Sequence, residues 1–208
     1  MAFSGCNAKI EDIAVSIFDI PTDEPESDGT LEWDHTTLVL VEATAANSCG
    51  LGYSYADRAT AILVQDVLAR IVAGRDAMDV RGAWSAMVSA IRNLGRPGIA
   101  SMAIASVDNA LWDLKARLLG IPLVKLLGAV RESVPVYGSG GFTSYSDAQL
   151  QRQLAGWAES GIEMVKMKVG RKPEDDVRRV QIARDAIGEG AHAASLTAPS
   201  AAVNGLAP

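Results

Sequence analysis

The sequence predicts an α+β domain followed by the first βα units of a parallel sheet, and two observations support this. Strand-like segments occupy the first 55 residues and helix-like segments follow as far as residue 119, an order typical of α+β domains. From residue 133 onward, strand-like and helix-like segments alternate at roughly 30-residue spacing, which indicates βαβ units and parallel pairing. Two such units cannot complete a sheet that needs cover on both faces. We therefore expect the second part to be incomplete or to take partner strands from elsewhere.

Three strands are predicted first. Apolar residues alternate with small or polar ones over residues 13–17, which indicates a half-buried strand. Residues 20–29 hold two prolines and four acidic residues and predict a solvated loop rather than a metal cage. A second strand is predicted over 37–43, and a turn at 47–50 leads to a third over 51–55. The short links favour an antiparallel meander.

Three amphipathic helices are predicted next. Apolar residues recur at helical spacing over 64–71, 84–94 and 99–119. Asp79 is predicted to cap the N-terminus of the second helix, and the third helix is predicted to end at Gly120. The residues predicted to face the core are Val64, Val67, Leu68 and Ile71, then Trp84, Met87, Val88, Ile91 and Leu94, then Ala103, Val107, Ala110, Leu111, Leu114 and Leu118.

The second part is predicted as strand, helix, strand, helix. The strands are expected over 134–137 and 164–169, with a glycine-rich loop at 138–141 between the first strand and its helix. Ser146 is placed to cap the first helix, and the second opens at Pro173. The inward residues are predicted to be Leu150, Leu154 and Trp157, then Val177, Val180 and Ile187, with Gly188 as C-cap.

Composition excludes several classes of protein. The net charge of −6 speaks against a nucleic-acid-binding surface, and no stretch approaches the ~20 apolar residues of a membrane span. The N-terminus lacks a signal-peptide pattern, and the two cysteines have no CxxC spacing. We expect a cytoplasmic protein that binds neither nucleic acid nor membranes.

The lysine pair at 166 and 168 is the most informative motif. On a strand, residues i and i+2 point the same way, so both ammonium groups leave one face while Val165, Met167 and Val169 leave the other. If that face is enclosed, repulsion and desolvation lower a lysine pKa toward the range of a general base. If it is exposed, the lysines discourage edge pairing, and the sequence alone leaves both readings open.

Other candidate sites are weaker. The glycines at 138–141 could cradle a phosphate, but the GxGxxG pattern is absent and a flexible loop also explains them. A tight turn explains the glycines at 50–52. His35 and His192 have no partner that would suggest a triad or a zinc site.

Several segments in order resemble one known family. These are residues 37–42 running into 50–53, residues 106–115 (SVDNALWDLK) with 119–122 and 126–128, residues 134–137, and residues 166–168. Together they resemble the enolase superfamily, in its mandelate racemase and muconate lactonizing enzyme branch. The resemblance runs from about residue 10 to residue 188, and 106–115 is its most specific segment.

The resemblance implies an α+β capping domain over residues 1–130 and the first two βα units of a modified (β/α)8 barrel over 131–190. Intact barrels of this kind take ~250 residues, with the active site at the C-terminal ends of the strands. Residues 191–208 contain no Asp, Glu, Lys or Arg, and we expect them to be an abnormal tail without a defined fold.

The resemblance also implies the chemistry. In this superfamily a Lys or His base abstracts the proton α to a carboxylate while Mg²⁺ stabilises the enediolate. Lys168 resembles the general base, and Lys166 the lysine that tunes it and faces the substrate carboxylate. Tyr53 and Tyr137 are predicted substrate contacts, and the loops 20–33 and 50–55 resemble the cap loops that set specificity. The expected protein is a homo-oligomeric, Mg²⁺-dependent acid-sugar dehydratase or hydroxy-acid racemase/epimerase that acts on a small carboxylate.

The expected metal ligands are missing from the sequence. The family's three carboxylate ligands follow its third, fourth and fifth barrel strands, and after Gly188 the chain instead reads EGAHAASLTAPS. We therefore assign no metal ligand and predict an inactive, truncated or frameshifted chain. If residues 194–197 are encoded GCT TCG TTG ACN, reading two bases later gives Phe-Val-Asp, so a frameshift near Gly190 is our hypothesis. It fails if the coding DNA resumes no barrel-like reading frame downstream.

Three alternatives stay open. The chain could be a non-catalytic interaction or oligomerisation module built on the cap, a muconate-type cycloisomerase, or a nucleotide-binding fragment that uses residues 138–141.

Overall fold

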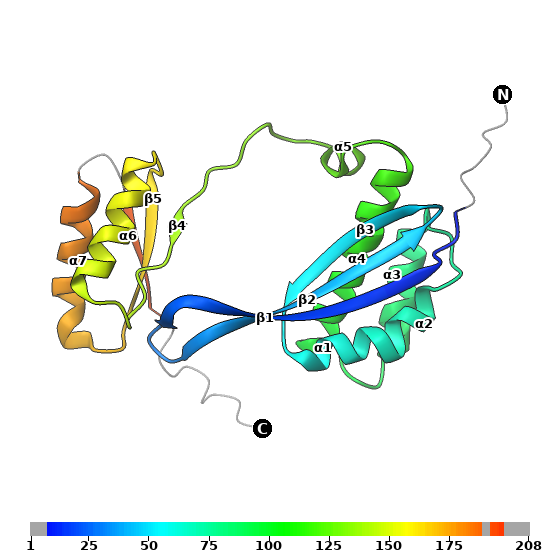
Figure 1. Cartoon of the computed structure of the whole chain (residues 1–208), viewed down its shortest axis with the longest axis horizontal. Helices are drawn as coiled ribbons and strands as arrows, with labels where there is room; N and C mark the ends of the chain where they lie inside the picture. Colours follow the sequence, from blue (N-terminus) through cyan, green and yellow to red (C-terminus); the bar gives the residue numbers. More distant parts are fainter. Residues whose placement is uncertain (1–7, 189–191, 198–208) are drawn as a thin grey trace, which may run out of the picture. The chain divides into compact units, whose positions relative to one another are not determined.

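The computed structural model describes residues 8–188 and 192–197, and the chain divides into two units (Figure 1). The first unit contains the residues up to Ile20 together with Thr36–Glu132. The second contains Pro21–His35 and the residues from Ser133 onward. The segment Pro21–His35 therefore belongs with the βα units, whereas the sequence placed it in an unbroken domain over 1–130.

The N-terminal sheet has three strands in the order β1-β2-β3. They are β1 (Asp12–Ser27), β2 (Glu32–Ala45) and β3 (Ser48–Tyr55). Strands β2 and β3 pair antiparallel, with Leu38 opposite Tyr55 and Ala45 opposite Ser48. The predicted antiparallel meander is confirmed.

The loop predicted over residues 20–29 is wrong for most of its length. Residues 21–27 continue β1, and Pro21 and Pro25 lie within the strand. Strand β1 is at the edge of the sheet, where a proline's missing N–H can face solvent without breaking a ladder. The chain reverses only after Ser27, before β2 begins at Glu32.

The predicted turn at 47–50 is also displaced. The two residues between β2 and β3 are Ala46 and Asn47, both with positive φ, as the tight turns of hairpins require. Gly50 and Gly52 lie inside β3 instead. A Cβ on Gly52 would meet the Ser106 carbonyl oxygen at 2.0 Å, so these glycines allow a helix to approach the strand closely.

The helices of the first unit follow β3. They are α1 (Arg58–Leu63), the π-helical segment η1 (Val64–Leu68), α2 (Ala69–Val72), α3 (Val80–Ala90), α4 (Ile99–Leu118) and α5 (Leu123–Leu127). The Asp79 side chain accepts a hydrogen bond from the Gly82 N–H, which confirms the predicted cap of α3. The short helix α5 was not predicted, and Leu94 lies beyond α3 and is exposed rather than inward.

The core of the first unit lies between the sheet and α4. Helix α4 packs on β3 over the two glycines, and its predicted stripe is buried, apart from Leu118, which is partly buried. The fully buried side chains with the largest volumes here are Ile10, Leu68, Met87, Ile91, Leu111 and Leu114.

The second unit contains a parallel sheet in the order β4-β5-β6. Its elements are β4 (Gly138–Ser139), α6 (Asp147–Glu159), β5 (Met164–Val169), α7 (Pro173–Ile187) and β6 (His192–Thr197). Ser146 caps α6 in a capping box with Gln149, Pro173 opens α7, and Gly188 is its C-cap. Leu150 and Leu154 of α6 and Ile187 of α7 form the core with one face of β5.

Three predictions for the second unit are corrected. The first strand is at Gly138–Ser139 rather than 134–137, because the glycines, not the valines, meet β5. Val177 is 82% exposed rather than inward. Residues 192–197 form β6, which pairs with β5, so this part of the predicted tail has a defined fold. Pairing with β6 satisfies backbone groups of β5 on the side away from β4. Residues 191 and 198–208 lie outside the described residues.

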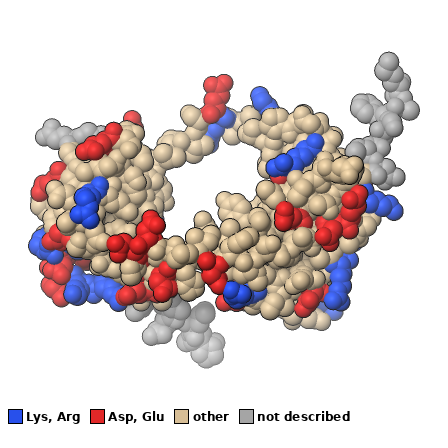
Figure 2. All heavy atoms as spheres, viewed as in Figure 1, with Lys and Arg blue, Asp and Glu red and all other residues tan. Residues whose placement is uncertain are grey.

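Charged side chains of both signs are interspersed on the face shown in Figure 2. Among the described helices, none has the length and apolar character needed to cross a bilayer.

Candidate active site

The lysine pair lies on the open face of β5. Along Met164–Val169 the side chains alternate, with Val165, Met167 and Val169 buried and Lys166 and Lys168 half-buried. The buried three pack against α6 and α7. The predicted division of this strand into an apolar face and a lysine face is therefore seen in the structure, and both ammonium groups leave the sheet on the side that the helices do not cover.

Glycines at 138–141 hold the neighbouring strand against β5. The Gly140 N–H donates to the Lys166 carbonyl oxygen (3.1 Å), and the Lys168 N–H donates to the Gly141 carbonyl oxygen (3.0 Å). A Cβ on Gly138 would lie 2.3 Å from the Trp157 ring, so Trp157 packs directly on this backbone. Residues 138–139 are strand rather than the predicted flexible loop, and packing explains the glycines without a phosphate.

Lys168 has a lowered pKa. Its partial burial disfavours the charged form most, and the positive charge of Lys166 adds to the effect, whereas the negative charge of Asp28 opposes it. Desolvation and a like charge were the two causes expected from the sequence. A lysine with these neighbours releases its proton at lower pH than a free lysine, which suits a general base.

The two predicted tyrosines lie in different units. Tyr137 is 53% exposed, and its ring centroid is 5.4 Å from the Lys166 Nζ, a cation–π distance. Tyr53 is on β3 of the first unit, where it is 58% exposed and its ring makes an edge contact with Tyr55. The structure thus brings Tyr137 together with the lysine pair.

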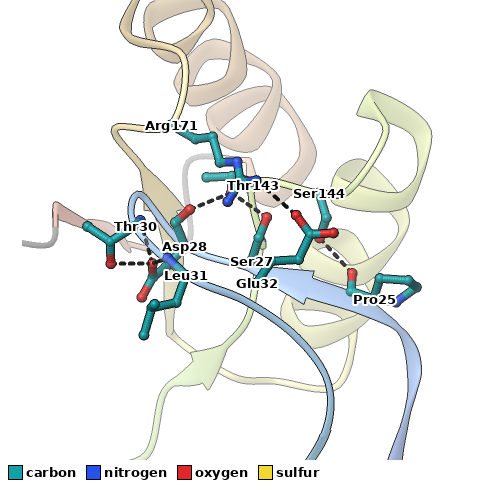
Figure 3. A network of polar contacts seen from close by, with 9 residues as sticks. All are labelled: Pro25, Ser27, Asp28, Thr30, Leu31, Glu32, Thr143, Ser144 and Arg171. Carbon is teal, nitrogen blue, oxygen red and sulfur yellow. Dashed lines mark hydrogen bonds and ion pairs between the residues drawn. The ribbon is translucent and has the colours of Figure 1, made fainter.

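The tip of the β1–β2 hairpin, residues 25–32, lies against the βα loops of the same unit (Figure 3). The Thr143 hydroxyl donates to the Asp28 carbonyl oxygen (2.8 Å) and is 2.6 Å from the Ser27 hydroxyl. The Thr143 N–H donates to the Ser27 carbonyl oxygen (2.9 Å), and the Ser144 hydroxyl donates to the Pro25 carbonyl oxygen (2.6 Å). These bonds fix the tip on the loop that follows β4.

Additional contacts join the hairpin tip to the second unit. Arg171 pairs with Glu32 at 2.8 Å, and the rings of Trp33 and Phe142 meet edge to face with centroids 5.6 Å apart. Sequence reasoning treated residues 20–29 as a solvated loop and missed this docking. The Asp28-Gly29 pair, a frequent turn signal, was the clue to where the hairpin reverses.

Arg179 holds the other side of that loop. It is 7% exposed, and its guanidinium donates to the carbonyl oxygens of Phe142 (2.8 Å) and Tyr145 (2.9 Å). Its Nε has no hydrogen-bond partner among the described residues. Arg179 was predicted only as a residue of an amphipathic helix, because nothing in the helical period shows which carbonyl groups a buried arginine will meet.

The described residues do not fit a magnesium site. Within residues 8–188 and 192–197, no three His, Cys, Asp or Glu side chains gather where they could hold a metal ion. Strand β6 follows β5 in the sheet, and its sequence HAASLT contains no carboxylate. The Oδ1 atom of Asp28 already accepts hydrogen bonds from the N–H groups of Thr30 and Leu31. Hard cations prefer several oxygen ligands at once.

Together, an antiparallel capping domain and parallel βα units with two lysines on one strand define a class of enzymes with a cap and a (β/α)8-type barrel. A family model for the mandelate racemase/muconate lactonizing enzyme N-terminal domain matches residues 14–128. The chain belongs to this family of the enolase superfamily.

Three relatives illustrate the match. L-Talarate/galactarate dehydratase of Salmonella typhimurium is 32% identical over 193 residues, which are 87% of this chain and 48% of that protein. The crystal structure of a mandelate racemase/muconate lactonizing enzyme-like protein from Rubrobacter xylanophilus is 53% identical, with a TM-score of 0.88 over 90% of this chain and 52% of that one. A racemase from Streptomyces coelicolor A3(2) with bound magnesium is 32% identical, with a TM-score of 0.84 over 89% and 54%.

Two facts qualify these matches. Cycloisomerases also occur among the relatives, so the family includes all three reaction classes that the sequence resemblance implied. The chain spans about half the length of the curated relatives it matches.

Proposed function

We propose that this chain forms the capping domain and the lysine-bearing part of an enzyme that abstracts the proton α to a carboxylate. The reaction would be that of an acid-sugar dehydratase or a hydroxy-acid racemase or epimerase. The lysine pair on the open face of β5 carries the proposal, because burial and Lys166 lower the pKa of Lys168. The similarity to an acid-sugar dehydratase and to a racemase supports the substrate class.

Each site residue has a proposed role. Lys168 is the general base that accepts the α-proton. Lys166 lowers the pKa of Lys168 and binds the substrate carboxylate, and Tyr137, whose ring lies beside the Lys166 ammonium, lines the same face. Tyr53 is proposed as a substrate contact from the cap. The proposed assignment of β5 to a (β/α)8-type barrel supports these roles, because the active sites of such barrels gather at the C-terminal ends of the strands.

The described residues supply a base but no metal site. Mg²⁺ in this family stabilises the enediolate that forms when the α-proton leaves, and the described carboxylates do not gather to hold it. Abstraction without stabilisation of the developing charge loses a large part of the rate. We therefore propose that the chain by itself is catalytically inactive.

Two measurements test this proposal. The purified chain is incubated in D₂O with galactarate or mandelate, with and without Mg²⁺, and the α-proton signal is followed by NMR. We expect no exchange and no dehydration above the protein-free rate. Exchange that EDTA abolishes would show that the chain holds a working metal site after all.

Ligand binding tests the lysine face directly. The lysines are ¹³C-methylated, and their NMR signals are followed during titration with galactarate or with galactitol, the matched polyol without carboxylates. We expect galactarate to move the Lys166 signal and galactitol to leave it in place. If galactarate moves no signal of the pair, the proposed role of Lys166 is wrong.

A second candidate function is an interaction or oligomerisation module. Several apolar side chains of the first unit after α4 are exposed, and Val130 is 87% exposed. Exposed apolar residues close together mark interaction surfaces, and they favour the expected homo-oligomer. The residues are Ile121, Val124, Leu127 and Val130. Light scattering coupled to size-exclusion chromatography distinguishes a defined oligomer from a monomer.

A further inference from the structure

We propose that Asp28, at the tip of the β1–β2 hairpin, is a positioning residue for the lysine pair, and that Thr143 is the latch that keeps it in place. In this arrangement the cap hairpin supplies a counter-ion to Lys168. The inference rests on the proposed role of Lys168 as the general base. It adds a residue that belongs to the cap strands in sequence but to the second unit in structure.

The backbone of the hairpin tip lies at the C-terminal end of β5. A Cβ added to Gly29 would be 3.0 Å from the Val169 carbonyl oxygen and 3.5 Å from the carbonyl carbon of Gly170. Val169 directly follows Lys168, and Asp28 directly precedes Gly29. The contact between the two backbones therefore places Asp28 next to the end of the strand that carries the lysines.

The carboxylate of Asp28 is ionised and held in one orientation. Its Oδ1 accepts hydrogen bonds from the Thr30 N–H (2.7 Å), the Thr30 hydroxyl (3.0 Å) and the Leu31 N–H (2.8 Å). These donors, the backbone groups first, lower the pKa of Asp28. The Asp28 N–H also donates to the Leu31 carbonyl oxygen (3.0 Å). These bonds fix the carboxylate relative to its own turn, so its position depends on where the turn lies.

Thr143 joins this turn to the βα loop. Its hydroxyl donates to the Asp28 carbonyl oxygen, and its N–H donates to the carbonyl oxygen of Ser27, the last residue of β1 (Figure 3). The loop itself is held from α7, because Arg179 donates to the carbonyl oxygens on either side of the segment. Arg179 thus holds the residues on both sides of the segment 143–144, and Thr143 within that segment donates to the backbone of Asp28.

The charges that act on Lys168 oppose one another. Lys166, on the same face of β5, favours loss of the Lys168 proton, whereas Asp28 favours its retention. With the tip docked, the negative charge of Asp28 partly offsets the effects of burial and of Lys166, so that Lys168 keeps its proton to higher pH than it would without Asp28. When Asp28 moves away or loses its charge, Lys168 releases its proton at lower pH. The position of the hairpin tip therefore adjusts the strength of the base.

Substitution of the charge alone tests the counter-ion. Asp28→Asn keeps the side-chain oxygen that accepts the turn's hydrogen bonds and removes the charge. The chain has six lysines, so ¹³C-methyl signals can be assigned with Lys166→Arg and Lys168→Arg. In a pH titration we expect the pKa of Lys168 to fall by about 0.5 or more in Asp28→Asn. Glu32→Gln, which removes another carboxylate of the tip, should change the pKa of Lys168 by less than about 0.2.

Substitution of the latch tests the positioning. Thr143→Val removes the hydroxyl with little change in volume, and the pKa of Lys168 should fall toward the value in Asp28→Asn. Thr143→Ser, which restores the hydroxyl, should return it. In the double variant Asp28→Asn/Thr143→Val, the second change should add nothing, because both act through one interaction. A pKa unchanged in Asp28→Asn, in a variant with native circular dichroism, overturns the proposal.

The latch has its own contradicting result. If Thr143→Val increases the amide exchange rates of residues 25–32 but leaves the pKa of Lys168 unchanged, Thr143 does not position Asp28. Neither titration requires turnover. The counter-ion result therefore stands or fails independently of the galactarate experiment on the proposed function.

Discussion

Helix α4 approaches β3 so closely that Gly52 cannot carry a side chain. In Gly52→Ala the added carbon would lie 2.0 Å from the Ser106 carbonyl oxygen and 2.5 Å from the Ala110 nitrogen, where ordinary contact begins at 3.4 Å. Both atoms belong to the helix backbone, so no side-chain rotation relieves the overlap. The helix would have to move by more than an ångström through a packed core. We expect a loss of about 3 kcal/mol or more, at the upper end of overpacking effects.

Gly156→Ala is the matched control for this prediction. Gly156 lies within α6, and nothing would lie within 4 Å of the added carbon. The same substitution should there stabilise by about 0.5–1 kcal/mol, because alanine favours the helix. Urea unfolding followed by far-UV circular dichroism compares the two variants. A Gly52→Ala midpoint equal to that of the unchanged chain would refute the close-packing argument.

Two further predictions concern the second unit. Ser146→Ala removes the hydroxyl that accepts a hydrogen bond from the Gln149 N–H at the start of α6, and it should lower the free energy of unfolding in urea by about 1 kcal/mol. Ser160→Ala, at the other end of the helix, should change that free energy by less than about 0.5 kcal/mol. Equal effects of the two substitutions would contradict the capping role of Ser146. Lys166→Met removes a positive neighbour, so the pKa of Lys168 should rise toward its ordinary 10.5. Because the unfolded chain binds the Lys168 proton more tightly than the folded chain does, the free energy of unfolding increases as the pH rises toward 10.5. Urea unfolding between about pH 8 and 10 should show a smaller increase in Lys166→Met than in the unchanged chain. A larger increase in the variant would contradict this reasoning.

The sequence predicted the elements whose structure depends on residues close together in the chain. Strand β5 was predicted at its observed bounds, because apolar and lysine residues alternate with the period of a strand. Asp79 and Ser146 were predicted as caps for the same kind of reason, since capping depends on residues within one turn. The lysine face followed from the alternation alone.

Elements that depend on distant contacts were missed. Strand β1 continues through Pro21 and Pro25 because it lies at a sheet edge, and edge position cannot be read from the residues themselves. Strand β4 consists of glycine and serine because Trp157, distant in sequence, packs on it. The Asp28 carbonyl oxygen likewise accepts its hydrogen bond from Thr143, more than a hundred residues away, which no short-range pattern encodes.

The β1–β2 hairpin has a consequence for how the protein unfolds. Strands β1 and β2 are hydrogen-bonded neighbours, and each contributes residues to both units. The polypeptide thus passes between the units three times, twice as paired strands and once at Glu132–Ser133. Local opening of the hairpin would remove contacts from both units at once. Hydrogen exchange should therefore find Phe18 to His35 opening together with elements on either side, as one cooperative segment rather than as a surface loop.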